Sequence, residues 1–318
     1  MRRLLADGER VIRARRRIPG RVARKHHLMS IVITGASGHL GRLVATAVLD
    51  AADPSDVVLV TRDPSRLTDL AERGADVRAG DFADPRSLEH AFSGATKVLI
   101  ISTQEVGARV PGHKAAIDAA AATGASIAYT SGINPSDSNP IVVARDHRAT
   151  EEHLRASGAR WTMLRNSIYT EVLLDAAPPA IATGEYVTNE GDGRVSYVAR
   201  ADCAAVAAAV LTTDGHEGKE YDVTGPDALG VGEVAVLFRA LSGRSVEPVL
   251  VDDDVYAAGL VEQAGLPEPV ARAYTTFGIG TRRWYSAPVS TTVADLTGRA
   301  PVSARAVLEA HRDVFEGP

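Results

Sequence analysis

The stretch SIVITGASGHLGRLVATAVLD, residues 30–50, constrains the fold more than any other part of the chain. A short run of β-branched residues leads into Gly35, Gly38 and Gly41, and a helical pattern follows at once. A Gly-x-x-Gly-x-x-Gly turn is a weak indication by itself, because glycines also mark ordinary turns, but its place between a strand and a helix strengthens it. The pattern predicts a turn that holds a nucleotide, and a purely structural turn is the alternative.

Each glycine has an expected task in such a turn. Gly35 would make the tight turn, Gly38 would let the backbone approach a pyrophosphate, and Gly41 would let the helix pack closely on the strand. Backbone N–H groups would then face the phosphates at the start of the helix, where the helix dipole favours anions. The residues expected at the phosphates are Gly35, Ser37, Gly38, His39, Leu40 and Gly41.

The end of the second expected strand indicates which dinucleotide binds. Enzymes that use NAD usually carry an acidic residue here for the ribose 2′-hydroxyl, but this chain reads LVTRDPSR, with Arg62 at that place and Arg66 nearby. Charge-assisted hydrogen bonds from arginine favour a 2′-phosphate, so NADP(H) is the predicted cofactor. The alternative is a solvated turn in which Arg62 pairs with Asp63.

Asp81 and Phe82, in the GDF sequence after the third expected strand, form a second candidate contact with the cofactor. There they would border the adenine. The spacing fits a turn aspartate followed by a core aromatic almost as well, so both interpretations stay open.

Short β-branched runs alternate with Ala-rich helical stretches over the first half of the chain. Such alternation predicts an α/β fold of the Rossmann type, a doubly wound parallel sheet with helices on both faces. The mostly continuous apolar runs fit strands that are covered on both sides. The expected strands are 30–34, 56–61, 75–80, 97–102, 126–131 and 160–166, with one more at 219–225.

The pattern loosens after residue 166, where 177–212 mixes turns, a short strand and a helix. We therefore predict an NADP-binding Rossmann domain over 29–166. A smaller C-terminal α/β lobe over 167–318 would send strands back to the sheet and form the substrate side of a cleft.

Charge is distributed unevenly along the chain. Residues 1–28 hold nine Arg and one Lys against one Asp and one Glu, a formal charge of +8, so the rest carries −13 within a total of −5. An acidic body argues against a surface for nucleic acid. The basic extension is expected to be disordered or to precede the true start at Met29, with a transit peptide and a nucleic-acid arm as the alternatives.

Composition disfavours several protein classes. The single cysteine, Cys203, permits no intramolecular disulfide and lies in an apolar helical stretch. It is expected in the core of a protein from a reducing compartment, the cytoplasm. No Cys/His cluster has metal-ligand spacing, so no metal is expected, and the longest apolar stretch, 204–213, is too short to cross a bilayer.

Several motifs together resemble the NmrA-like atypical short-chain dehydrogenases/reductases: TGASGHLG, TRDPSR, ISTQEVGARVPGH, IAYTS and LRNSIYTE. Within that family they are similar to the branch of type 2 NADPH:quinone oxidoreductases and triphenylmethane reductases. The resemblance covers residues 29–318. It implies NADP(H) in a cleft between the Rossmann domain and the lobe, and hydride transfer to a quinone or a similar flat conjugated acceptor.

The resemblance also implies where the nicotinamide lies. Ser102 and Thr103 after the fourth strand and Ser131 after the fifth would line its side, and the segment after the sixth strand would hold it and border the acceptor. The residues implied in that segment are Asn166, Ser167, Tyr169 and Glu171. Asn166 and Tyr169 are the catalytic candidates; Tyr169 would donate a hydrogen bond to the acceptor oxygen, or would only pack with its hydroxyl at the rim.

Proton chemistry narrows the reaction. No tyrosine is followed by a lysine four positions later, and no lysine lies between Lys114 and Lys219, where the isoflavone-reductase branch of the superfamily has one. A positioned acid typically contributes roughly 10²- to 10⁴-fold, but a quinone needs it less, because hydride addition yields a resonance-stabilised phenolate. His147, Thr150 and Glu151 share one helix face by their spacing and are either a proton relay or a structural cluster.

The sequence therefore predicts an NAD(P)H-dependent oxidoreductase with a small-molecule, quinone-like acceptor. It predicts no nucleic-acid or membrane partner, and a homodimer as the candidate assembly. The alternative is a redox sensor that binds NADP(H) without turnover and acts through a partner protein, since a missing Tyr-x-x-x-Lys motif fits both.

Overall fold

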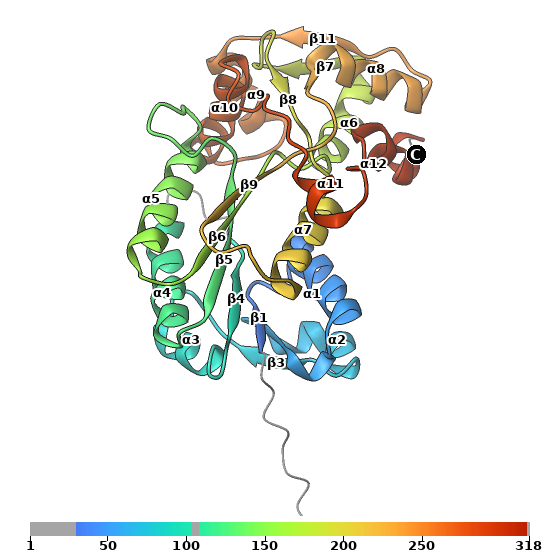
Figure 1. The fold of residues 1–318 in the computed structure, drawn as a ribbon. Coiled ribbons are helices and arrows are strands. Elements are labelled where there is room, and N and C mark those ends of the chain that lie inside the picture. Colours follow the sequence, from blue (N-terminus) through green and yellow to red (C-terminus); the bar gives the residue numbers. More distant parts are fainter. Residues whose placement is uncertain (1–29, 104–107, 317–318) are drawn as a thin grey trace, which may run out of the picture.

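The computed structural model describes residues 30–103 and 108–316. Its centre is a seven-stranded parallel sheet in the order β3-β2-β1-β4-β5-β6-β9 (Figure 1). The strands are β1 (Ile31–Ile33), β2 (Val57–Thr61), β3 (Asp76–Ala79), β4 (Lys97–Ile100), β5 (Ser126–Gly132), β6 (Trp161–Asn166) and β9 (Lys219–Val223). Each expected strand is present, and the predicted Rossmann-type fold is confirmed.

The strand order reverses between β1 and β4, so the chain winds outward from these two strands in both directions. Because the strands are parallel, their carboxyl ends lie at one edge, and a ligand crevice forms where the order reverses. We call this edge of the sheet the carboxyl edge and the opposite one the amino edge.

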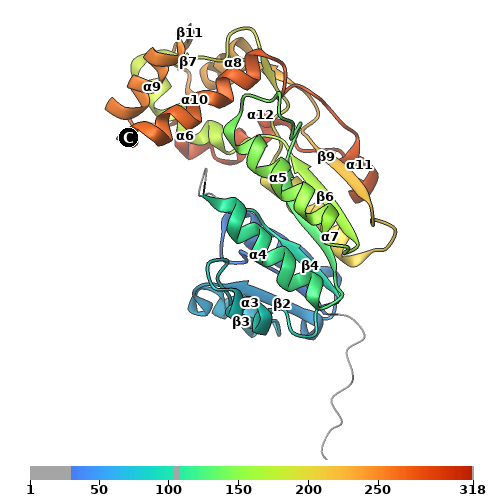
Figure 2. The same cartoon turned by 90° about the vertical axis from the view of Figure 1, so that its left-hand side faces the viewer.

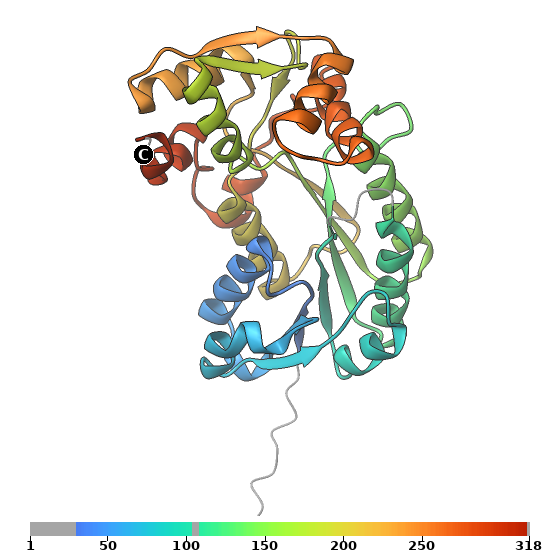
Figure 3. The ribbon, with the colours of Figure 1, turned by 180° about the vertical axis from the view of Figure 1, so that it is seen from behind.

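Helices cover both faces of the sheet because its central strands are apolar on both sides. One face carries α1 (His39–Ala51), α7 (Arg200–Thr212) and α11 (Thr292–Thr297), and the other carries α3 (Pro85–Ala91), α4 (Arg109–Ala122) and α5 (Val142–Ala156), as Figures 1 and 3 show. Leu40, Val44 and Val48 form the buried side of α1 at a spacing of four residues. Cys203 on α7 is buried in the same core, as expected.

A smaller lobe lies beyond the carboxyl edge (Figure 2). In it β7 (Glu185–Thr188) pairs in parallel with β11 (Glu247–Leu250), and β8 (Arg194–Val195) pairs antiparallel to β10 (Leu229–Gly230). Its helices are α6 (Val172–Thr183), α8 (Val231–Ser242), α9 (Asp253–Glu262), α10 (Glu268–Arg282) and α12 (Ala304–Ala310). Phe238 packs against Tyr186 and Phe315 in the core of the lobe.

The short helical elements complete the chain. They are η1 (Pro54–Asp56), η2 (Pro64–Leu67), α2 (Thr68–Glu72) and η3 (Arg312–Phe315). In the described ranges no helix has the length and apolar character that a membrane crossing needs. The domain boundaries stay a prediction, and the basic extension over 1–28 lies outside the described residues.

The lobe differs from its sequence interpretation at α6, which runs through Pro178 and Pro179. Proline removes a backbone donor and usually ends a helix, so the sequence suggests turns there. The helix persists because Leu173, Ala177 and Ile181 form a buried apolar face that packs into the core of the lobe.

Candidate active site at the carboxyl edge

The turn after β1 requires glycine at two positions. Gly35 has φ = +61°, in the left-handed region that favours glycine. A Cβ on Gly41 would lie 2.1 Å from the carbonyl oxygen of Gly35, so only glycine lets α1 approach the turn. Gly38, which precedes α1, donates its N–H to the Gly35 oxygen at 3.0 Å. These contacts match the tasks of Gly35 and Gly41 expected from the sequence.

The turn is also fixed to the neighbouring strand β2. Ala36 donates its N–H to the Val60 carbonyl at 3.1 Å, and the hydroxyls of Ser37 and Thr61 lie 2.8 Å apart. The start of α1 has neither a side-chain cap nor an acidic residue in its first turn. Its amino-terminal N–H groups therefore need a partner, and an anion is the group that the helix dipole favours there.

His39 and Leu40, the first two residues of α1, differ in burial. The His39 side chain is exposed, whereas Leu40 is buried in the core. Leu40 can therefore reach a ligand only through its backbone.

Arg62 follows β2 with an exposed side chain. Within the described ranges the structure gives its guanidinium no hydrogen bond and no ion pair, and the alternative pairing with Asp63 is not formed. The Asp63 carboxylate instead accepts hydrogen bonds from the N–H and hydroxyl of Ser65, at 3.1 and 2.6 Å, and these bonds lower its pKa. Arg62 thus remains available to a phosphate at this edge.

Asp81 and Phe82 lie in the turn after β3, half-buried. Asp81 Oδ1 accepts the N–H of Ala83 at 3.0 Å, and the Phe82 ring packs edge-on against His113 of α4 with centroids 6.2 Å apart. Both residues thus have the structural roles that the sequence left open, and their contact with adenine stays a prediction.

Two buried polar atoms without a partner lie at the ends of adjacent strands. Ser131 Oγ on β5 and Asn166 Oδ1 on β6 are enclosed, and neither has a hydrogen-bond partner in the described part of the chain. The pairing register joins Ser131 to Arg165 and Gly132 to Asn166, so the two residues lie one position apart at the carboxyl ends of adjacent strands. An unpaired buried polar group costs about 1–3 kcal/mol, which favours a ligand that completes it.

Ser102 and Thr103 follow β4, which pairs with β5 on the side away from β6. Ser102 accepts a hydrogen bond from Thr130 Oγ1 at 3.3 Å, and Thr103 donates its N–H to His113 Nε2 at 3.0 Å. Arg109 of α4 donates to the Thr103 carbonyl at 3.1 Å. The loop expected at the nicotinamide is therefore anchored to α4 on one side and to β5 on the other.

The segment after β6 contains the remaining predicted residues. Asn166 Nδ2 donates to the Tyr169 hydroxyl at 3.3 Å, and burial raises the Tyr169 pKa, so the phenol stays protonated. The Ser167 hydroxyl lies 3.0 Å from that of Ser196. The Glu171 carboxylate accepts the backbone N–H of Arg200 at 3.0 Å, at the start of α7, so it already has a partner.

Sequence reasoning missed a buried polar cluster between β5, α4 and α5. The Tyr129 hydroxyl lies 2.9 Å from His147 Nδ1 and 3.3 Å from His113 Nδ1. All three side chains are buried. No spacing rule joins residues from three elements; the available signal was a tyrosine in an apolar strand and a histidine inside an Ala-rich helix.

The three residues considered as a proton relay do not form one. Thr150 lies 3.2 Å from His113 Nδ1, but Glu151 pairs with Arg165 through two bonds of 2.9 and 2.7 Å and with Arg155 at 2.8 Å. Only His147 and Thr150 face the buried cluster. Burial lowers the pKa of His113 to about 4 and the pKa of His147 well below its usual value, so both imidazoles are neutral near pH 7.

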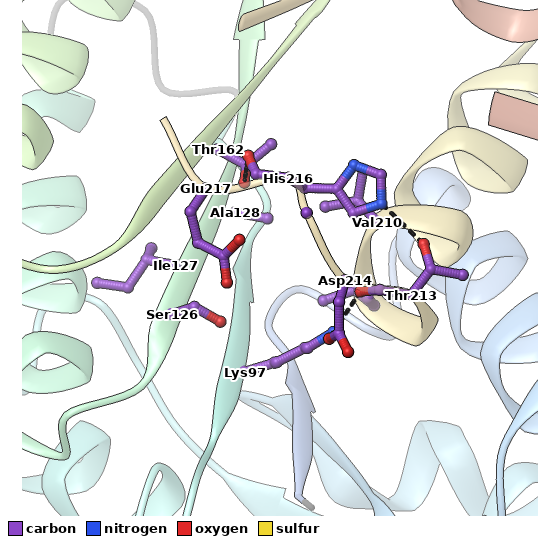
Figure 4. Close-up of a pocket in the computed structure, with 12 residues that line it drawn as sticks. Lys97, Ser126, Ile127, Ala128, Thr162, Val210, Thr213, Asp214, His216 and Glu217 are labelled. Atoms are coloured by element: carbon purple, nitrogen blue, oxygen red, sulfur yellow. Dashed lines mark hydrogen bonds and ion pairs between the residues drawn. The ribbon is translucent and has the colours of Figure 1, made fainter. Parts of the chain in front are cut away.

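A small pocket of about 20 Å³ lies at the opposite, amino edge (Figure 4). Lys97 donates there to the Thr213 carbonyl at 2.6 Å, and Thr162 donates to the His216 carbonyl at 2.8 Å. The pocket has room for about one water molecule, so it is no candidate for a cofactor site.

The comparison with protein families shows which class of cofactor the chain binds. A family model described as NAD(P)H-binding matches residues 35–214, more than half of the chain, from the glycine turn through α7. The chain belongs to the NAD(P)H-binding family. Quinone oxidoreductase 2 from Escherichia coli (strain K12) is 36% identical over 269 residues, which are 84% of this chain and 93% of that protein.

Two solved structures of the same architecture contain the cofactor. An NADPH-dependent quinone oxidoreductase from Escherichia coli, complexed with NADPH, gives a TM-score of 0.84 at 35% identity and covers 88% of this chain and 99% of its own. The triphenylmethane reductase of Citrobacter sp., complexed with NADP(H), gives 0.83 at 31% identity with 88% and 99% coverage. The predicted resemblance and nicotinamide cofactor are confirmed, and this member of the NAD(P)H-binding family is an oxidoreductase.

The residues present fit such a cofactor. Gly41 and Gly35 leave the backbone of the turn open where a Cβ would clash or strain it. The unpaired atoms of Ser131 and Asn166 provide hydrogen-bonding groups at the next strand ends. A dinucleotide along this edge would satisfy both the helix start and these atoms.

Proposed function

We propose that this oxidoreductase holds NADPH along the carboxyl edge and reduces a flat, conjugated, quinone-like acceptor there. The observation that carries the proposal is the pair of enclosed, unpaired atoms of Ser131 and Asn166 at the end of β5 and β6. The relatives named above act on a quinone and on a triphenylmethane dye, which share an extended, electron-poor π system.

The residues of the chain would bind the cofactor, orient the acceptor and exclude water from the site. The turn from Gly35 to Gly41 would hold the pyrophosphate, Arg62 the 2′-phosphate, and Ser131 and Asn166 the nicotinamide side. When bound, NADPH supplies a hydride, and a proton from water completes the reduction of a quinone to a hydroquinone. Tyr169, protonated and half-buried next to Asn166, would border the acceptor.

The first test measures NADPH oxidation by its absorbance with purified protein and benzoquinone, beside a blank without protein. NADPH binding is measured in the same preparation. We expect acceptor-dependent oxidation. Tight binding of NADPH without oxidation across several quinones would overturn the proposal and indicate the redox sensor instead.

The preference for NADPH over NADH rests on Arg62 and is tested with Arg62→Ala. A charge-assisted hydrogen bond contributes roughly 1.5–3 kcal/mol, so NADPH affinity should fall about 10- to 100-fold while NADH affinity stays unchanged. Arg160→Ala, which removes another exposed arginine at the amino edge, is the matched control. An equal loss for both cofactors would show that Arg62 does not bind the 2′-phosphate.

The homodimer and the cytoplasmic location stay predictions. Light scattering of the purified protein would measure the mass of the assembly in solution.

A further inference from the structure

A backbone N–H determines which nitrogen of His113 donates and which accepts a hydrogen bond. Thr103 donates its N–H to His113 Nε2 at 3.0 Å, so Nε2 is an acceptor. A neutral imidazole with an accepting Nε2 carries its proton on Nδ1. His113 Nδ1 is therefore a donor, and it faces the Thr150 hydroxyl at 3.2 Å and the Tyr129 hydroxyl at 3.3 Å.

The donor and acceptor roles of Tyr129 and His147 follow from this assignment. The Thr150 hydroxyl donates its hydrogen to the Asp146 carbonyl at 2.8 Å. The Tyr129 hydroxyl has one hydrogen to give, and His113 Nδ1, as a donor, cannot accept it. The other contact of the hydroxyl, His147 Nδ1 at 2.9 Å, is therefore its acceptor. His147 Nδ1 then accepts, which places the His147 proton on Nε2.

The Nε2 side of His147 lies at the carboxyl edge. A Cβ on Gly132 would lie 3.1 Å from His147 Cδ2 and 3.6 Å from Nε2, so this edge of the ring borders the last residue of β5. Gly132 follows Ser131 directly and pairs with Asn166 in the sheet register. Within the described ranges Nε2 has no hydrogen-bond partner, although His113, Tyr129 and Thr150 all have one.

We propose that His147 donates a hydrogen bond from Nε2–H to the acceptor oxygen on which negative charge develops, and that Tyr129 and His113 are positioning residues that fix its tautomer. This inference deepens the proposed function and rests on it. The donor stabilises charge without giving up its proton, and the proton that completes the reduction comes from water. Preorganised donors of this kind act most strongly where charge develops in a water-poor site.

The surroundings of His147 keep the imidazole neutral, as this role requires. Burial is the largest cause of its lowered pKa, and the charge of Arg109 adds to it. Arg109 itself pairs with Asp146 at 3.1 Å, and Glu151 is occupied by Arg165. No carboxylate therefore contacts the ring, in the described part of the chain, to hold a second proton on it.

The donor should matter most for acceptors that hold negative charge poorly. We compare His147→Asn, whose amide replaces only the Nδ1 side, with His147→Gln, whose longer amide reaches the Nε2 side. His153→Asn is the matched control, because His153 lies on the same helix and pairs with Asp118 at the surface. Each variant is assayed with benzoquinones that carry none to four methyl groups.

For His147→Asn we expect kcat to fall about 10- to 100-fold with the tetramethyl quinone and about threefold or less with benzoquinone. His147→Gln should recover most of the loss, and His153→Asn should behave like the unmodified protein. NADPH affinity should stay within about twofold in all of them. An equal fall across the series, or no fall, would overturn the role of His147 as donor.

A second measurement does not depend on turnover. The ¹⁵N shifts of the imidazoles in the protein without cofactor report which nitrogen carries the proton, and His147→Gln assigns the signal. We expect Nε2–H for His147 and Nδ1–H for His113, and the opposite tautomer at His147 would overturn the inference. If the unmodified protein oxidises no NADPH with any quinone, the proposed function fails, and the role of His147 toward the acceptor fails with it.

Discussion

The carboxyl edge and the amino edge of the sheet carry similar side chains, namely serines, threonines and histidines next to strand ends. At the amino edge Lys97, Thr162 and His216 each have a hydrogen-bond partner around a pocket of about 20 Å³ (Figure 4). At the carboxyl edge Ser131 Oγ and Asn166 Oδ1 are enclosed and unpaired within the described residues.

The difference indicates that the amino edge of the sheet contributes to stability and the carboxyl edge to ligand binding. Polar groups at the amino edge satisfy one another, so they contribute to folding. At the carboxyl edge Ser131 Oγ and Asn166 Oδ1 are left without partners in the described part of the chain at a cost in stability, and a ligand that completes them recovers this free energy on binding. The same types of residue therefore have different functions, depending on whether the protein itself supplies their partners.

The largest expected effect comes from Gly41→Ala at the carboxyl edge. The added Cβ would lie 2.1 Å from a backbone oxygen, which cannot move aside as a side chain can. We expect the free energy of unfolding to fall by about 3 kcal/mol and NADPH affinity to fall at least about tenfold. Urea denaturation and a binding titration measure the two.

Gly259→Ala in α9 is its control, since a Cβ there meets no other atom within 4 Å. Alanine stabilises a helix interior by about 0.5–1 kcal/mol relative to glycine. Equal effects of the two substitutions would show that position 41 does not require glycine for stability or for NADPH binding.

The second effect concerns pH and the buried histidines. His113 binds a proton in the unfolded chain near pH 6.5 but in the folded protein only near pH 4. Between these values the unfolded state binds more protons, so stability falls as the pH falls. The loss that His113 causes by pH 4 is about 2–3 kcal/mol.

His113→Asn should therefore flatten the dependence of unfolding free energy on pH between 6.5 and 4. His216→Asn, at the amino edge, should flatten it less, because that histidine is only partly buried. Denaturation curves at several pH values measure the free energy of unfolding. The same pH dependence for the His113 variant and the unmodified protein would contradict the prediction.

The smallest effect distinguishes the two edges most directly. Ser131→Ala removes an unpaired hydroxyl, so stability should stay constant or rise slightly while NADPH affinity falls about threefold to tenfold. Thr162→Val removes a hydroxyl bonded to the His216 carbonyl. It should cost about 1 kcal/mol of stability and leave NADPH affinity unchanged. If both variants lost stability alone, the two edges would not differ in function.

The sequence was sufficient for the features that depend on local order along the chain. The alternation of apolar runs and helices predicted the strands, and the strand–glycine–helix order predicted the turn at Gly35 and Gly41. These predictions succeed because neighbouring residues decide them: a positive φ and a close helix approach each require glycine at a defined place.

Features built from distant residues could not be predicted in the same way. His113, Tyr129 and His147 meet only because α4 and α5 pack side by side against β5, and no spacing in the chain shows this contact. The shared helix face of His147 and Glu151 was visible, but not the presence of Arg165 on β6, which occupies Glu151. Likewise α6 continues through its prolines because of packing that the local sequence does not reveal.

The return of β9 and α7 to the sheet limits how this chain can be divided. β9 pairs with β6, and α7 packs against α1, so a fragment ending at Asn166 would expose a bare strand edge and an apolar helix side. Exposed strand edges recruit other chains and aggregate. The lobe is formed by chain on both sides of residues 199–223, which belong to the sheet domain. Exchange of the lobe with that of a relative would therefore have to replace the stretches before and after 199–223 together. New acceptor preferences would accordingly arise more readily by point substitution within the lobe than by recombination at a single junction.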